Sequence, residues 1–266
     1  MNSLDNVYYN IKPVFHTFVF EIRLQMKKFV IFSGMTFALL FLNSYIIYIV
    51  NLSLGSQAHF YEFGTTYFHI IIVLTVSFFF GGSICSEFKN KTGLAILPLI
   101  NRYKLIIGKY FANLVIVIGI IAVHYLTMAL FAYNFYGGPL LYTLLYSFGF
   151  AVLYALALGS IATFLSSFLS SKTPVIIIMV GYILIVDDIV YFLILGVSGE
   201  IEPFYRFWYI FRIIIYILYP DFSTMDRRRN NGRWLFPSIE GALILLSLYI
   251  VLFFILGTLL FKRREF

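Results

Sequence analysis

Two adjacent carboxylates, Asp187 and Asp188, lie within an otherwise apolar run of the sequence. An acidic side chain at membrane depth is costly to bury, so it usually faces a cavity or a charged partner. One interpretation is that this pair forms a substrate or cation site in a translocation path. Asn113 or His124 from a second copy of the chain would then complete the site.

The other interpretation of the acidic pair is structural. The helix that carries both carboxylates would break early, and the pair would bond Arg206 or Arg212 at the outer surface of the membrane. Neighbouring residues on a helix diverge by about 100°, so the two carboxylates cannot point the same way. The sequence leaves both interpretations open.

No other residues form a recognisable reaction centre. A phosphate-binding P-loop ends in Gly-Lys-Ser or Gly-Lys-Thr, whereas Gly108 and Lys109 are followed by Tyr110. The four histidines are scattered, and Cys85 is the only cysteine, which excludes an internal disulfide and a paired-cysteine metal site. We therefore predict no catalytic residues, no metal, no cofactor and no enzymatic activity for this chain.

The elements that carry these residues are expected to be membrane-spanning helices. Of the 266 residues, 61% are hydrophobic and 12% are charged, whereas soluble domains carry about 25% charged residues. A soluble core of this size could not hide so much apolar surface, so the excess must face lipid. The net charge of +7 then indicates cytoplasmic loops and anionic lipid contacts rather than nucleic acid.

Six apolar runs with few or no charges are long enough to cross a bilayer, which takes about 20 residues. One longer uncharged stretch is divided into two spans by the turn residues 136–139. The sequence thus predicts an all-α membrane protein with six transmembrane helices in a single domain, residues 1–266. The predicted spans are Phe29–Val50, Thr65–Cys85, Lys109–Phe135, Leu140–Leu169, Pro174–Ser198 and Gly241–Phe261.

The distribution of Lys and Arg predicts that both termini are cytoplasmic. Short cytoplasmic loops are rich in basic residues, and an inside N-terminus places 13 of the 19 basic residues in inner segments. The first two outer loops, 51–64 and 136–139, contain none, whereas the third, 199–237, contains the other six. The inner basic residues are Lys12, Arg23, Lys27, Lys28, Lys89, Lys91, Arg102, Lys104, Lys109, Lys172, Lys262, Arg263 and Arg264.

The third outer loop contains an apolar stretch, Phe204–Tyr219, that is interrupted by Arg206 and Arg212. This stretch is short for a seventh span, and its two arginines would be costly to bury in lipid. It could instead form re-entrant or interfacial helices on the outer face. The sequence therefore favours six spans.

The cytoplasmic N-terminus, residues 1–28, is expected to contain an amphipathic helix, Pro13–Lys28, that lies in the membrane interface. Glu21, Lys27 and Lys28 lie opposite its apolar face. The alternative is a plain cytoplasmic extension of the first span. The apolar face comprises Phe15, Phe18, Val19, Ile22, Met26 and Phe29.

The loop between the second and third spans, residues 87–104, is charged at both ends and apolar in the middle. This pattern predicts a short amphipathic helix, Glu87–Leu97, that stops before Pro98, because a proline disfavours helix in the residue before it. Leu94 and Leu97 could present an apolar knob to a cytoplasmic partner. The segment could equally be an ordinary basic loop.

This loop resembles the cytoplasmic loop of ABC-2 type permeases. In that family a glutamate at the end of the second span precedes a Thr-Gly pair, a Leu-rich turn, a Pro, an Arg and a Gly-Lys pair that opens the third span. The C-terminus is also similar, because Phe261 is followed by three basic residues and Glu265. The matching loop residues are Glu87, Thr92, Gly93, Leu97, Pro98, Arg102, Gly108 and Lys109.

The resemblance implies a permease subunit in the cell membrane that pairs with a second permease copy, identical or not. A separate cytoplasmic ABC ATPase subunit would bind the ATP and dock on residues 87–104. The helix Pro13–Lys28 would brace this coupling loop, and Phe204–Tyr219 would form re-entrant helices. The coupling residues that the resemblance implies are Glu87, Thr92, Gly93, Leu94, Leu97, Pro98 and Arg102.

The exported substrate is expected to be apolar or amphipathic. The alternative function is an ion-coupled secondary transporter or channel that uses Asp187 and Asp188. Tyrosines of the third and fourth spans could line a path for an amphipathic molecule: Tyr125, Tyr133, Tyr142, Tyr146 and Tyr154.

Overall fold

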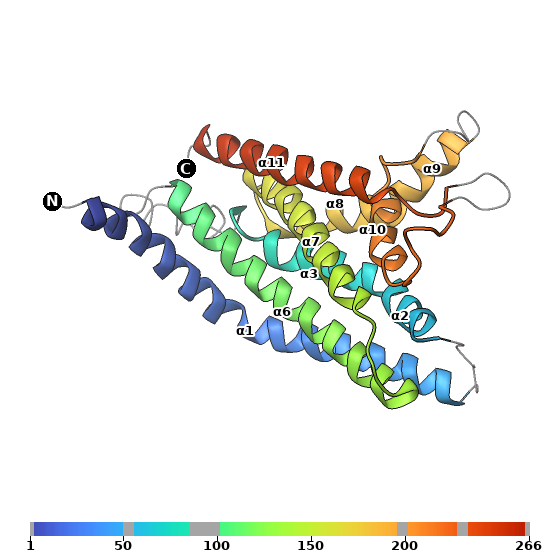
Figure 1. Cartoon of the computed structure of the whole chain (residues 1–266). Coiled ribbons are helices and arrows are strands. Elements are labelled where there is room, and N and C mark those ends of the chain that lie inside the picture. The colour runs from blue at the N-terminus through green and yellow to red at the C-terminus, as the bar shows by residue number, and fades with distance from the viewer. Residues whose placement is uncertain (1–2, 50–55, 86–101, 196–201, 228–233, 264–266) are drawn as a thin grey trace.

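The computed structural model describes residues 3–49, 56–85, 102–195, 202–227 and 234–263. Long helices make up most of this part of the chain, and they run side by side between two ends of a bundle (Figure 1). The elements are α1 (Ser3–Ile49), α2 (Gln57–Thr66), α3 (Phe68–Phe80), α6 (Arg102–Tyr136), α7 (Thr143–Phe168), α8 (Lys172–Gly181), the π-helical turn η1 (Tyr182–Val186), α9 (Asp187–Leu195), α10 (Phe207–Tyr216) and α11 (Ile239–Arg263).

Five of the described helices are long and apolar enough to cross a membrane. They lie in α1, α6, α7, the continuous α8–η1–α9 and α11, and the bent pair α2–α3 supplies a sixth crossing if it is one span. Only helices that satisfy their own backbone hydrogen bonds can cross lipid in this way. The all-α membrane fold predicted from the sequence is therefore confirmed.

The alternative of a seventh span at Phe204–Tyr219 is not found in the described residues, in agreement with the six spans that the sequence favours. Within Phe204–Tyr219 the helix α10 covers only ten residues, Phe207–Tyr216, or about 15 Å of helix. Nearly every side chain of α10 is buried, and the helix packs against α2, α7 and α11. It is thus a short helix enclosed at one end of the bundle, which we call the α10 end. The start of α1 and the end of α11 lie at the other, which we call the termini end (Figure 1).

The second span begins earlier than expected. Residues Gln57–Thr66 form α2, although the sequence analysis placed 51–64 in an outer loop. Ser56 caps this helix, because its side chain accepts the backbone N–H of His59. At Tyr67 the chain bends by 42° before α3 continues the crossing. Because α2 contains several polar residues, apolar length alone does not predict this helix.

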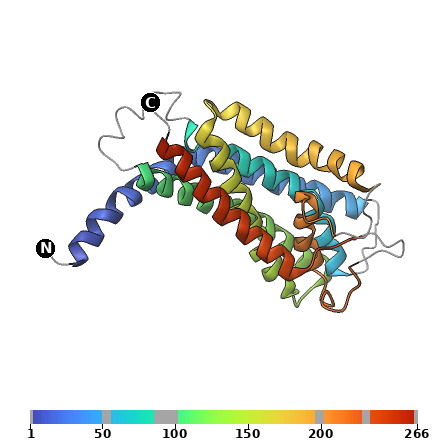
Figure 2. The same ribbon diagram turned by 90° about the horizontal axis from the view of Figure 1, so that it is seen from above.

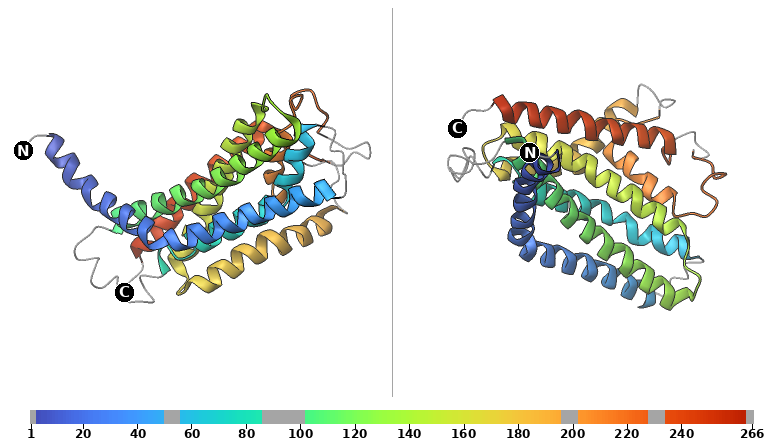
Figure 3. Two further views of the ribbon diagram at one scale, coloured as in Figure 1. Left: turned by 90° about the horizontal axis from the view of Figure 1, so that it is seen from below. Right: turned by 60° about the vertical axis from the view of Figure 1, so that its left-hand side comes forward.

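The N-terminal segment is continuous with the first span. One helix, α1, runs from Ser3 to Ile49 without a break at residue 28, as the alternative of a simple extension requires. Its N-terminal part nevertheless projects beyond the bundle and runs at an angle to the rest of the helix (Figures 2 and 3).

The orientation of this segment differs from the amphipathic prediction. Of the predicted apolar face, Phe15 and Met26 are exposed, whereas Glu21, expected opposite that face, is buried. The reason is tertiary, because α1 packs closely along α6, which offers Glu21 a basic partner.

Candidate functional site

The predicted coupling residues fall mainly outside the described part of the chain. Glu87, Thr92, Gly93, Leu94, Leu97 and Pro98 lie within residues 86–101, and Arg102 is the first residue of α6. The structure does describe the two points from which this segment leaves and returns. These are the turn 81–85 after α3 and the beginning of α6.

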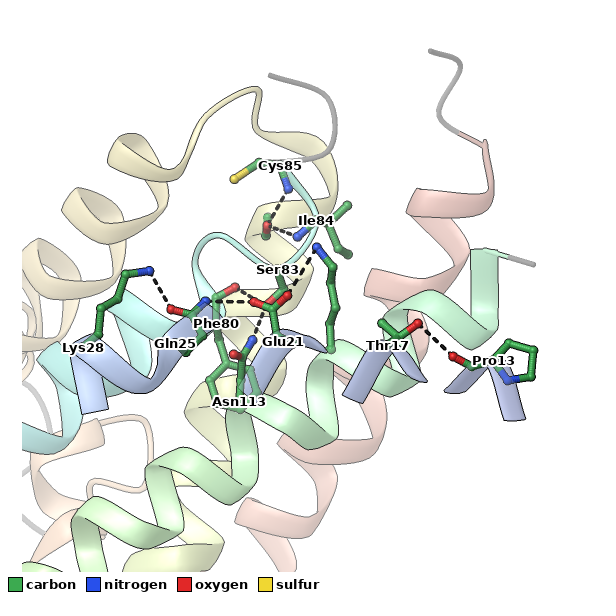
Figure 4. A network of polar contacts seen from close by, with 12 residues as sticks. Pro13, Thr17, Glu21, Gln25, Lys28, Phe80, Ser83, Ile84, Cys85 and Asn113 are labelled. Carbon is green, nitrogen blue, oxygen red and sulfur yellow. Dashed lines mark hydrogen bonds and ion pairs between the residues drawn. The ribbon is translucent and has the colours of Figure 1, made fainter. Parts of the chain in front are cut away.

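The departing turn is fixed to α7. The backbone N–H groups of Ile84 and Cys85 both donate to Ser166 Oγ, each at 3.0 Å. Ser83 Oγ donates to the carbonyl oxygen of Phe80 at 2.6 Å, which closes the last turn of the helix (Figure 4). The bond to Phe80 satisfies a carbonyl group that the C-terminal end of a helix leaves free. The two bonds to Ser166 tie the base of the segment to a transmembrane helix.

The chain returns from this segment at the start of α6, which is fixed to α1 by the Gly-Lys pair of the sequence motif, Gly108 and Lys109. A Cβ atom on Gly108 would lie 2.8 Å from Thr17 Cβ and 2.8 Å from the carbonyl oxygen of Val14. Only glycine allows this close approach of the two helices. The next residue, Lys109, places its Nζ 3.8 Å from Glu21 Oε2. The pair thus combines close backbone packing with a charge contact.

Around this ion pair a small polar network is buried between α1, α6 and the turn after α3 (Figure 4). Gln25 Nε2 donates to Glu21 Oε1 at 2.8 Å, and Lys28 Nζ donates to Gln25 Oε1 at 2.6 Å. Across from them, Asn113 Nδ2 donates to Ser83 Oγ at 3.1 Å. We call this network the polar joint; it comprises Glu21, Gln25, Lys28, Ser83, Lys109 and Asn113.

The charges of the polar joint are withdrawn from solvent. The side chains of Glu21 and Lys109 are only 6% and 9% exposed. Removing one partner of such a pair leaves the other charge buried and uncompensated, which is strongly unfavourable. The two helices that carry the pair are therefore expected to move together rather than separate.

An apolar cluster adjoins the polar joint and includes the C-terminal motif. Ile84, Ile106 and Phe261 are each at most 3% exposed and pack together. Phe261 at the end of α11 thus contacts both ends of the 86–101 segment, Ile84 in the turn after α3 and Ile106 in α6. The base of that segment thus connects α1, α3, α6, α7 and α11.

The acidic pair serves a different purpose at the α10 end. Asp187 is buried, and its carboxylate accepts the backbone N–H of Phe207 at 3.0 Å and of Trp208 at 3.4 Å. It therefore caps the first turn of α10, which the preceding residue, Arg206, leaves without a side-chain cap. A carboxylate is favourable there because the N-terminus of a helix carries partial positive charge.

The arginine between them completes this arrangement. Arg206 Nε lies 3.5 Å from Asp187 Oδ2, and an Arg206 Nη2 contact reaches Asp188. We use the name α10 clasp for Asp187, Asp188 and Arg206 together with the backbone N–H groups of Phe207 and Trp208, which donate to Asp187. The pairing with Arg206 is the one that the structural interpretation expects. The helix does not break, however; the π-helical turn Tyr182–Val186 leads directly into α9.

Two further arginines of the expected outer loop also have partners. Arg227 donates to Glu202 Oε1 at 2.9 Å, and Arg212 lies over the ring of Phe236 at 5.0 Å. Glu202 accepts the Tyr209 hydroxyl as well. These contacts explain how basic residues occur beside a buried apolar helix. Glu202 was not among the residues predicted from the sequence, where its only signal is an acid between two aromatic stretches.

The other residues proposed for a translocation path do not gather around Asp187 within one subunit. Asn113 belongs to the polar joint, and the ring of His124 stacks on Phe68 with centroids 3.6 Å apart. Tyr125 and Tyr154 are buried and bonded to Ser147 and His69. The remaining tyrosines of the predicted path are exposed: Tyr133, Tyr142 and Tyr146.

Within the described residues no group of three or more His, Cys, Asp or Glu side chains could hold a metal ion.

Comparison with known proteins identifies a family for this chain. The model of the ABC-2 family transporter protein matches residues 81–266, which is more than half of the chain and includes the turn after α3, α6 and everything that follows. No curated protein matches the chain. The resemblance drawn from the loop motif is thereby confirmed, and the chain belongs to the ABC-2 family of transporter proteins as a membrane-spanning permease.

Proposed function

We propose that the protein is the permease subunit of an ATP-driven exporter and that a separate ATPase subunit docks on the segment 86–101. The main support for this proposal is the way the two ends of the segment are attached to the transmembrane helices. Both of its ends are built into buried contacts with transmembrane helices, through Ser166 on one side and Glu21 on the other. A force on this segment would therefore reach the bundle directly.

The path of that force follows from the packing. Lys109 at the start of α6 pairs with Glu21 of α1, and α1 and α6 pack against each other along their length. Packed helices transmit displacement because protein interiors are dense and resist compression. Movement of the segment would thus tilt α1 and α6 as a unit and change access between the two sides of the membrane.

Membrane orientation and assembly are part of the same proposal. We place the termini end in the cytoplasm, because the short loops near it carry most of the basic residues. A second permease copy would pair with this one, and the exposed apolar side chains of α1, α6, α8 and α11 are available to it and to lipid. The projecting part of α1 would lie near the inner membrane surface and brace the coupling segment.

The ion-coupled alternative receives less support. The Asp187 carboxylate is already used by two backbone N–H groups and by Arg206. A carboxylate in this state would have to release α10 before it could bind an ion. The geometry thus favours a role for Asp187 in holding α10 in place.

Co-purification tests the proposal directly. The chain is co-expressed with a candidate P-loop ATPase of the ABC type, sought first among adjacent reading frames, and the complex is isolated through a tag on the permease. Glu87→Arg and Leu94→Arg are expected to abolish recovery of the ATPase, whereas Ser223→Arg, an exposed position at the α10 end, should leave it unchanged. Full-rate transport by the isolated permease in liposomes, without any nucleotide-hydrolysing partner, would refute the proposal.

A further inference from the structure

Two lysines at the termini end, Lys28 of α1 and Lys172 at the start of α8, lie on the helices that flank α3. Helix α3 packs against both α1 and α8, which run along either side of it (Figures 2 and 3). The stem of Lys172 lies against the turn after α3, because a Cβ atom on Gly82 would be 3.3 Å from Lys172 Cδ. Lys28 belongs to the polar joint and is near enough for its charge to act on Lys172.

The positive charge of these two lysines is not balanced. Their ammonium groups repel each other. No carboxylate in the described part of the chain lies within ion-pair distance of Lys172, whose Nζ instead lies 5.1 Å from the ring centroid of Phe78. Glu21 attracts Lys172 from further away, but its carboxylate already faces Lys109 at 3.8 Å. An anion between the two ammonium groups would replace one repulsion by two attractions.

The lysine pair is open to the surroundings of the bundle. Lys28 and Lys172 are half-buried, and Thr173 beside them is exposed. Lys172 is the first residue of α8, and Lys28 directly precedes the predicted first span, so both ammonium groups belong at the depth of lipid head groups. The cap residue of α8, Ser171, makes no side-chain bond to the first turn, and the N-terminus of a helix itself favours an anion.

An apolar strip leads away from the lysine pair along α3. Every side chain of α3 is buried except those of Ile70, Leu74 and Phe78, which follow one another at intervals of four residues on one side of the helix. We call these three residues the α3 strip. It is about 12 Å long, close to the roughly 15 Å of hydrocarbon in one leaflet. Phe78 at one end of the strip lies beneath the Lys172 ammonium group.

We propose that Lys28 and Lys172 bind the phosphate group of an anionic phospholipid and that one acyl chain of this lipid lies along the α3 strip. Basic sites between membrane helices bind anionic head groups in this way. The lipid is a bound component of the permease and not its cargo. Its head group would join α1 and α8 beside the turn 81–85, from which the segment 86–101 departs. This inference goes beyond the proposed function, because binding of the lipid requires neither an ATPase nor a nucleotide.

Native mass spectrometry of the purified permease tests the inference. The protein in detergent is titrated with anionic dioleoyl phosphatidylglycerol and, separately, with zwitterionic dioleoyl phosphatidylcholine. The wild type is expected to retain one phosphatidylglycerol molecule in preference to phosphatidylcholine. Lys28→Gln and Lys172→Gln should each weaken this retention about fivefold, the contribution of one basic side chain at a membrane surface. Both substitutions together should remove the preference.

Matched variants separate a specific site from general charge and from misfolding. Lys27→Gln removes the same charge from the neighbouring, exposed position of α1, and it should leave retention unchanged. Lys172→Arg keeps the charge and should retain the lipid. Thermal unfolding in phosphatidylcholine checks that every variant is folded.

Two further ligands identify which part of the lipid is bound. Inorganic phosphate at millimolar concentration should not displace phosphatidylglycerol, because it makes no contact with the α3 strip. Dihexanoyl phosphatidylglycerol has the same head group on short chains and should be retained more weakly than the dioleoyl lipid.

Four results would overturn the inference. Equal retention of the two dioleoyl lipids would show that the lysines do not select a head group, and displacement by inorganic phosphate would show a site for a free anion. A disulfide-linked dimer of Ile70→Cys in membranes would show that a second copy covers the α3 strip. Loss of the ATPase from the complex in the double Gln variant would assign the lysines to the docking surface. The first three results leave the co-purification experiment unaffected, so failure of this inference and failure of the proposed function are distinguishable.

Discussion

The polar joint and the α10 clasp are both buried charge clusters at an end of the bundle, but they are built differently. In the clasp, the Asp187 carboxylate accepts two backbone N–H groups and faces a guanidinium. In the joint, the Glu21–Lys109 contact is 3.8 Å, and Asn113 Oδ1 has no hydrogen-bond partner among the described residues. The clasp fixes the first turn of α10 to α9 and suits an anchor, whereas the joint holds α1 to α6 beside the base of the 86–101 segment and suits a contact that transmits movement.

The largest effect is expected from breaking the clasp. Asp187→Ala leaves Arg206 and the first turn of α10 without their acceptor, and loss of one partner of a buried ion pair costs about 3–5 kcal/mol of unfolding free energy. Trp208 donates its backbone N–H to Asp187, so intrinsic tryptophan fluorescence during thermal unfolding in detergent reports the loss.

Asp188→Ala is the matched control for the clasp. This side chain is 60% exposed, so its contact with Arg206 is screened and worth at most about 1 kcal/mol. Equal destabilisation by both variants would show that the clasp does not depend on the cap made by Asp187.

The next largest effect on stability is expected from disturbing the close packing of α1 against α6 at Gly108. Gly108→Ala adds a methyl group 2.8 Å from Thr17 Cβ and from the Val14 carbonyl oxygen, so α1 must move away from α6. Overpacking of this kind costs about 1–3 kcal/mol, and thermal unfolding in detergent measures it. Gly34→Ala in α1 is the control, because no atom lies within 4 Å of its added methyl group; a cost as large as that of Gly108→Ala would contradict the argument.

Charge exchange tests whether the joint transmits movement. Glu21→Gln should leave the ATPase bound but reduce transport about tenfold, a coupling loss typical of linked sites. Reversal of the pair, Glu21→Lys with Lys109→Glu, should recover part of the rate, since the attraction is restored. Transport in proteoliposomes with the bound ATPase is the measurement, and Lys27→Gln on the exposed side of α1 is the control. Unchanged transport in Glu21→Gln would assign the pair to stability alone.

The smallest effect concerns a single bond at the α10 end. Tyr219 donates its hydroxyl to Glu62 of α2, so Tyr219→Phe should cost about 1 kcal/mol. Burial, together with the Glu62 carboxylate, raises the pKa of Tyr219 above its ordinary value.

The sign of the pH dependence follows from that shift. A group whose pKa is higher in the folded state contributes stability below its unfolded pKa, about 10 for tyrosine, and this contribution is lost as pH rises further. The stability difference between wild type and Tyr219→Phe should therefore be constant at neutral pH and shrink above about pH 10. A difference that grows at alkaline pH would show that the bond is not the one described.

Much of the fold could be predicted because lipid imposes strict conditions on sequence. The apolar runs that became α7 and α11 were located within three residues at each end, whereas α6 begins seven residues earlier than predicted. An apolar stretch of about 20 residues has few alternatives in a bilayer. The bend in α2–α3 was missed because Gln57–Thr66 is neither apolar nor charged in a regular pattern. The coupling residues at 87–98 lie outside the described residues, so their role remains a prediction.

The sequence by itself determined that this chain is a bundle of membrane helices with a loop motif of the ABC-2 family, because run length and motif order are properties of one segment at a time. Only the tertiary structure decided what the charged residues do. It turned Glu21 inward onto Lys109, and Asp187 onto the amides that begin α10. Those pairings depend on which helix faces meet, and that choice is made by packing among distant segments rather than by any local pattern.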